Sequence, residues 1–111
     1  MPEPLNLEGQ DLRSRDLSRL DLTGANLFGA NLAGMDLSGL CLAGATLASA
    51  NLTGADLTFT DARGANFTRA NMWGVMARCV DLEDADLHRA VLTGADLSHA
   101  DLRRANFHGA Y

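Results

Sequence analysis

The stretch DLTGANLFGANLAG at residues 21–34 repeats every five residues, and the same period runs along the whole chain. All eleven glycines fall at one phase of this period, which we name the Gly slot. Two residues earlier is the Leu slot, with Leu in sixteen of twenty-one positions; before it come an Asx slot, usually Asp or Asn, and an Ala slot. The residue between Leu and Gly is the variable slot. One repeating unit therefore governs the 111 residues.

A period of five suits neither a helix nor a straight strand. On a helix successive leucines would spiral around every side, and on a strand they would alternate between the two faces. The leucines converge on one core only if the backbone turns a corner in each pentad, with Gly supplying the positive φ that a type II turn requires. We therefore expect a solenoid whose coils pair in parallel, with Leu and Ala pointing inward.

The number of sides in each coil follows from residues twenty positions apart. If four pentads close one coil, such residues stack and should share a chemical character. Every Asn of the chain falls on two of the four sides, and the Asx slots of the other two sides hold Asp except at Cys41 and Met76. The sequence therefore favours a four-sided coil.

The repeated pattern A(D/N)LxG resembles the pentapeptide-repeat family over residues 5–110, without an insertion. The resemblance implies an all-β fold, a right-handed four-sided parallel β-helix of about five coils. We expect a single domain over residues 1–111, with residues 1–20 as an N-terminal capping coil because Gln10 and Arg15 replace the inward Ala. The predicted core consists of Leu27, Leu32, Leu37, Leu42, Leu47, Leu52, Leu57, Phe67, Met72, Leu82, Leu87, Leu92, Leu97 and Leu102.

Charge and composition narrow the function. The formal net charge of −5 argues against direct binding of nucleic acid through a basic surface. No segment approaches the roughly 18 apolar residues of a membrane span, and the first residues do not resemble a signal peptide. We expect a cytoplasmic bacterial protein with no membrane partner. Cys41 and Cys79 fall on different sides, nearly two coils apart, and are expected to be free thiols.

Two columns of aspartates allow two interpretations. We expect Asp16, Asp36 and Asp56 to stack directly on one side, and Asp61, Asp81 and Asp101 on another. In the first interpretation each carboxylate accepts a hydrogen bond from a nearby corner amide, a local role that Asp and Asn share. In the second the rod imitates DNA, because some pentapeptide-repeat proteins bind DNA gyrase as DNA mimics and protect bacteria from quinolones.

Catalysis is not expected. The sequence contains no nucleophile elbow, phosphate loop or paired-carboxylate cleft, and a packed rod is expected to offer no pocket. His88 and His108 should stack, but without a third rigid ligand we expect solvated side chains and no metal. We predict no catalytic residue and no cofactor.

Two surfaces are candidates for binding. Phe59, Trp73 and Met76 occupy slots where Gly, Thr and Asp are usual, and aromatic and Met residues are enriched at protein interfaces; scattered apolar surface residues are the alternative. At the other end of the rod, Leu102, Phe107 and Tyr111 are apolar, and the resemblance implies a homodimer through the C-terminal coil. We therefore expect a non-catalytic rod that binds an unknown protein partner; the alternative is a gyrase-binding DNA mimic.

Overall fold

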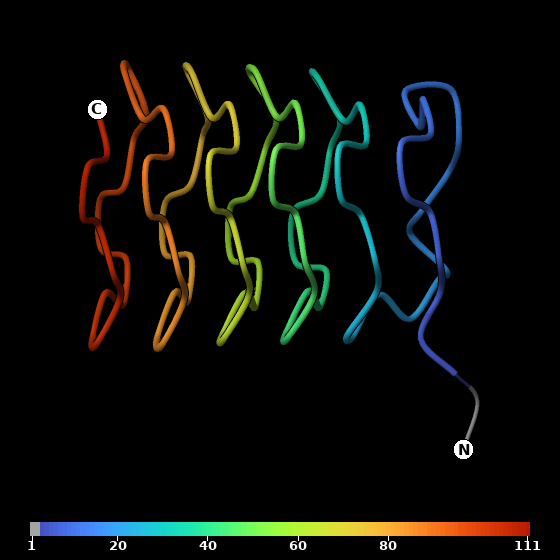
Figure 1. Cartoon of the computed structure of the whole chain (residues 1–111), viewed down its shortest axis with the longest axis horizontal. Coiled ribbons are helices and arrows are strands. Elements are labelled where there is room, and N and C mark those ends of the chain that lie inside the picture. Colours follow the sequence, from blue (N-terminus) through green and yellow to red (C-terminus); the bar gives the residue numbers. More distant parts are fainter. Residues whose placement is uncertain (1–2) are drawn as a thin grey trace.

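In a computed structural model that describes residues 3–111, the chain winds into a rod of stacked coils (Figure 1). Residues 1 and 2, which belong to the predicted domain and capping coil, lie outside the described residues. The parallel β-bridges all join residues twenty positions apart, from Asn6 with Asn26 to Asp86 with Asn106. Each coil therefore has four pentads, and residues 3–111 form isolated bridges rather than long strands or helices.

Coils and sides are numbered from this register. Coils 1 to 5 cover residues 5–24, 25–44, 45–64, 65–84 and 85–104, and residues 105–111 begin a sixth. Sides 1 to 4 contain residues 25–29, 30–34, 35–39 and 40–44 of coil 2, together with the residues stacked on them at intervals of twenty.

The corners are β-turns closed by the backbone. The N–H of Ala55 donates to the carbonyl oxygen of Leu52 at 2.9 Å, and Gly54 between them has a φ of +67°. This geometry is a type II turn, so the predicted role of the Gly slot is confirmed. Eight other residues take the same left-handed conformation in this slot: Ser49, Phe59, Arg69, Cys79, Asp84, Arg89, His99 and Arg104. Each costs backbone energy that Gly would not.

The Leu slots form the core. Eleven of the fourteen predicted core residues, from Leu27 to Leu87, are at most 1% exposed. Leu92 and Leu97 are partly buried. Leu102 is 39% exposed, so its assignment to the core is wrong, because no coil within residues 3–111 stacks on it.

The first coil is covered at its outer end. Its Ala slots hold Leu5, Gln10, Arg15 and Leu20, all longer than Ala. The Arg15 Nη1 donates a hydrogen bond to the Gln10 Oε1 at 3.3 Å, and Leu12 between them is fully buried. The two ends of the described rod therefore differ: Leu7, Leu12 and Leu17 are buried in coil 1, whereas in coil 5 Leu92 and Leu97 are only partly buried and Leu102 is exposed.

Coil 1 leaves the ladder on side 3 and over most of side 4, where the backbone N–H of Gly24 still donates to the carbonyl oxygen of Ala43 at 2.9 Å. On sides 1 and 2 the N–H groups of Asn26 and Asn31 donate to coil 1 at 2.8 and 2.9 Å. Within residues 3–111 no bridge joins Asp16 to Asp36, so the predicted direct stacking of these two aspartates is wrong.

The Ala slots of coil 2 provide a physical reason. They hold Ala25 and Ala30 where the ladder forms, but Met35 and Leu40 where it fails. Both longer side chains are partly buried against the core. Because interior packing tolerates little excess volume, these side chains hold coil 1 away from coil 2.

Candidate interaction surfaces

Every Asp or Asn in an Asx slot caps the turn that follows it. Its Oδ1 accepts a hydrogen bond from the backbone N–H two residues on, as Asn51 does from Thr53 at 3.1 Å and Asp56 from Thr58 at 2.9 Å. The predicted local role of these side chains is therefore confirmed. Since Asn and Asp cap equally well, the fold itself does not decide which of the two stands in a given slot.

Hydrogen bonds lower the pKa of several aspartates. The side-chain and backbone hydrogen bonds from Arg13 lower the pKa of Asp11 to about 2. The Ser38 hydroxyl, followed by its backbone N–H, lowers the pKa of Asp36, and the backbone N–H of Thr23 has the larger effect in lowering the pKa of Asp21. Hydrogen bonds to the charged form favour ionisation, so these carboxylates are anionic at neutral pH.

Side 4 carries the longest acidic column, but arginines interrupt it. Bridges stack Asp61, Asp81 and Asp101 on one another. The Nη2 of Arg63 lies 2.8 Å from the Asp61 Oδ2, and its Nε lies 3.7 Å from the Asp81 Oδ2. The Nη2 of Arg103 lies 2.7 Å from the Asp101 Oδ2. Exposed ion pairs contribute little stability, but they cancel much of the like-charge repulsion within the column.

Side 3 has a shorter acidic column. Asp36 pairs with Asp56, but Met76 follows in the next coil before Asp96 resumes the column. Because Asp16 also departs at the other end, only Asp36 and Asp56 stack of the three predicted on this side.

Two of the three predicted partner-surface residues lie at one corner. In coil 4, Trp73 is the second-last residue of side 2 and Met76 is the second residue of side 3, with only residues 74 and 75 between them. The two side chains are 54% and 50% exposed. Phe59 is 70% exposed but occupies the far corner of side 3, in coil 3. Phe28, which is 47% exposed on side 1, was not among the predicted residues; a large aromatic residue in a variable slot is the signal that could have found it.

Coil 5 and residues 105–111 expose further apolar side chains. Tyr111 is 78% exposed and Leu102 is 39% exposed, whereas Phe107 is partly buried against the core. The predicted dimer contact thus contains two accessible side chains and one that is half covered.

The titratable clusters outside these surfaces are small. His88 and His108 stack with ring centroids 5.3 Å apart and an interplanar angle of 6°. Within residues 3–111 no three His, Cys, Asp or Glu side chains are placed to hold a metal ion together. Cys41 and Cys79 are both free thiols. The same part of the chain has no helix of the length and apolarity that crossing a bilayer requires.

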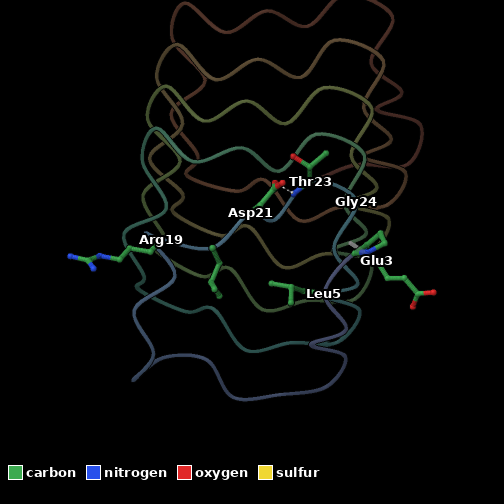
Figure 2. A pocket seen from close by; sticks show the side chains of 8 residues that line it. Glu3, Leu5, Arg19, Asp21, Thr23 and Gly24 are labelled. Atoms are coloured by element: carbon green, nitrogen blue, oxygen red, sulfur yellow. Dashed lines mark hydrogen bonds between the residues drawn. The ribbon is translucent and has the colours of Figure 1, made fainter. Parts of the chain in front are cut away.

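A hollow of about 660 Å³ lies between residues 3–5 and residues 19–24, at the start and the end of coil 1, which corrects the expectation that the rod has no pocket. Its lining includes Pro4, Leu5 and Leu20, and Figure 2 shows the charged ends of Arg19 and Glu3 pointing away from it on opposite sides. Asp21 accepts a hydrogen bond from the Thr23 N–H at 3.0 Å, so its carboxylate already serves a turn. The hollow is therefore a mainly apolar space between the first and the last residues of coil 1.

The comparisons with known proteins agree with this geometry. The family model for pentapeptide repeats matches eight copies, at residues 6–39, 41–74 and 80–111. The pentapeptide repeat protein Rfr23 of the cyanobacterium Cyanothece 51142 is 31% identical, with a TM-score of 0.57 over 96% of this chain and 80% of that chain. The protein alr5209 of Nostoc PCC 7120, also a pentapeptide repeat protein, is 30% identical, with a TM-score of 0.55 over 98% and 78%.

A more distant similarity adds little. QnrB1, a plasmid-mediated fluoroquinolone resistance protein, is 19% identical, with a TM-score of 0.48 over 97% of this chain and 70% of that chain. No curated protein matches in sequence. The predicted right-handed four-sided parallel β-helix is confirmed, and the chain belongs to the pentapeptide repeat family.

Proposed function

We propose that this protein is a non-catalytic rod that binds another protein through the corner formed by Trp73 and Met76. The observation that supports the proposal is the exposure of both side chains, 54% and 50%, at a single corner of coil 4. Aromatic and Met side chains are enriched at the centre of protein interfaces, where they bury large apolar areas. Arg78 on the adjoining side adds a third residue type that interfaces favour.

The fold supports a binding role over a catalytic one. Pentapeptide repeat proteins are generally non-enzymatic structural or interaction proteins. The Asx slots, which hold most of the carboxylates of this chain, are occupied with capping turns. Repeat rods also present long, regular surfaces, which suit contacts with proteins.

A photo-crosslinking amino acid placed at position 73 tests the proposal in cells of the native host. We expect ultraviolet light to give a discrete adduct on a denaturing gel. The same amino acid in place of Arg103, which is exposed on side 4, is the matched control and should give none. Equal adducts from both positions, or none from position 73, contradict the proposed surface.

The gyrase-binding DNA mimic remains the alternative, and the charges weigh against it. The net charge of −5 along the 31 Å axis amounts to about one charge per 6 Å, whereas B-DNA carries about one per 1.7 Å. Arg63 and Arg103 also pair with the acidic column of side 4. We expect purified gyrase to supercoil DNA unimpeded by this protein. Inhibition that disappears when Asp61, Asp81 and Asp101 are changed to Asn would favour the mimic instead.

A further inference from the structure

Side 2 is uncharged over four successive coils. The chain contains nine basic Lys and Arg residues and fourteen Asp and Glu residues, yet none stands in an outward slot of side 2 between residues 31 and 94. Those slots hold asparagines, threonines and glycines, with single Ala, Trp and Val residues. The charges of side 2 are confined to coil 1, where Arg13 and Asp11 pair at 2.8 Å. Covering this side therefore costs less desolvation energy than covering any other.

The asparagines of side 2 are not explained by the turns. Asp caps the same turns elsewhere, as Asp36 does at 3.0 Å, yet Asn31, Asn51 and Asn71 stand on side 2. Each amide oxygen faces the turn N–H, so the NH2 group is directed away from it. Within residues 3–111 these three NH2 groups donate to no protein atom, as is also the case for Asn66 on side 1, whereas the Asn26 and Asn106 Nδ2 atoms on side 1 donate to Asn6 and Asp86. Side 2 thus carries unused neutral donors.

The outline of side 2 is complementary to itself. Trp73 projects from coil 4, while the equivalent slot in coil 2 holds Ala33, beside Gly34. Coil 3 lies midway, with Thr53 in the same column. Consider a two-fold axis that lies in the plane of side 2, runs across the rod and passes through coil 3. It places a second, antiparallel rod against side 2 so that coil 4 of each copy faces coil 2 of the other, and Trp73 then lies over Ala33 and Gly34.

We propose that side 2 is a contact between two copies of this chain, related by that two-fold axis. Trp73 of each copy covers Ala33 and Gly34 of the other, and Asn51 faces Asn51 across the axis. The inference rests on the proposed function, because it names the partner of the surface that includes Trp73. It places the self-contact on a side of the rod and not at the C-terminal coil.

The charge of side 2 favours a second copy as its partner, and the area of side 2 indicates how strongly the two copies bind. A second copy also carries a charge of −5, and pairing side 3 or side 4 with itself would oppose acidic columns; side 2 avoids this. The axis through coil 3 pairs coils 2, 3 and 4 with coils 4, 3 and 2 of the second copy, and coil 5 lies opposite coil 1, where Asp11 and Arg13 pair with each other. Three coils span about 14 Å at about 4.8 Å each, and across the 22 Å width of the rod they offer roughly 300 Å² per copy, against about 800 Å² in a stable complex. We therefore expect a weak, reversible dimer, with a dissociation constant on the order of 100 µM to 1 mM.

Sedimentation equilibrium up to about 1 mM protein measures the association, and Trp73, the single Trp of the chain, reports it through its fluorescence. The decisive variant is Asn51→Asp, because Asp retains the cap on the turn but places two carboxylates against each other across the axis. We expect it to weaken association at least tenfold. Asn66→Asp on side 1 makes the same chemical change and adds the same charge, and should alter association less than twofold.

A second pair of variants separates the two possible contacts. Ala33→Trp fills the depression without adding charge, and we expect it to weaken association at least tenfold. Tyr111→Asp changes the C-terminal coil at a side chain that is 78% exposed, and should have no effect. Loss of the dimer in Tyr111→Asp, or equal losses in the Asn51 and Asn66 variants, overturns the proposal. A parent protein that stays monomeric at about 1 mM overturns it too, while an adduct to another protein from position 73 would leave the proposed function standing.

Discussion

Replacing Leu52 by Ala tests whether the Leu slots carry the stability of the rod. Leu52 is fully buried in coil 3, with coils stacked on both sides of it. The change removes three carbon atoms, which at about 0.8 kcal/mol per buried CH2 amounts to about 2.4 kcal/mol. The cavity left behind adds to this figure, because neighbouring coils are held by their own ladders and relax only in part. We therefore expect a loss of about 3–5 kcal/mol in the free energy of unfolding.

Two matched variants serve as controls for the loss predicted for Leu52→Ala. Leu102→Ala makes the same chemical change in the last coil, but the side chain is already 39% exposed, so the loss should be below about 1.5 kcal/mol. Thr53→Ala alters the outward neighbour of Leu52 and removes the hydrogen bond that the Thr53 hydroxyl donates to the Asn51 Oδ1. We expect this to cost less than about 1 kcal/mol.

Urea denaturation followed by circular dichroism measures all three variants. The slope of the unfolding free energy with urea must be compared as well as the midpoint, because a solenoid can lose its end coils before the centre. Equal shifts for Leu52→Ala and Leu102→Ala at equal slopes would refute the reasoning, since burial by neighbouring coils would then not determine stability.

Three further outcomes are expected. Phe59→Gly should raise the free energy of unfolding by about 0.5–1 kcal/mol in urea titrations, because Phe59 has a φ of +58° and a mostly exposed ring; a loss of stability would show that the ring makes contacts that outweigh the backbone strain. Thermal midpoints should be constant from pH 7 to about 4 and then fall toward pH 2. Hydrogen bonds lower the folded pKa of several aspartates below the unfolded value of about 3.9; for Asp11 the Arg13 side chain, followed by the capping N–H of Arg13, lowers it to about 2. Their contribution is therefore present above the unfolded value and is lost as they protonate; a midpoint that is unchanged at pH 2 would contradict the role of these hydrogen bonds. The double change Met35→Ala, Leu40→Ala should let coil 1 join the ladder, which amide hydrogen exchange would detect as new protection at Asp36; unchanged exchange there would refute the packing explanation.

The sequence by itself determined the fold, because the residues that specify each turn and each inward side chain lie within a single pentad. The Gly slot specifies the corner, the Asx slot caps it, and the Leu slot turns inward only if every corner is made. Stacking at twenty residues then follows from four equal sides, so the inward position of Leu52, the turn at Gly54 and the cap at Asp56 were all predictable from local pattern.

Only the tertiary structure decided where the pattern is interrupted and how the surface charges are distributed. The separation of coil 1 depends on Met35 and Leu40 meeting residues of the previous coil, and the exposure of Leu102 depends on what stacks upon it. Likewise Arg63 reaches Asp81 of the following coil, which the pentad containing Arg63 does not reveal. Such contacts join residues about twenty positions apart through side-chain length and volume, and these properties act only once the coils are in contact.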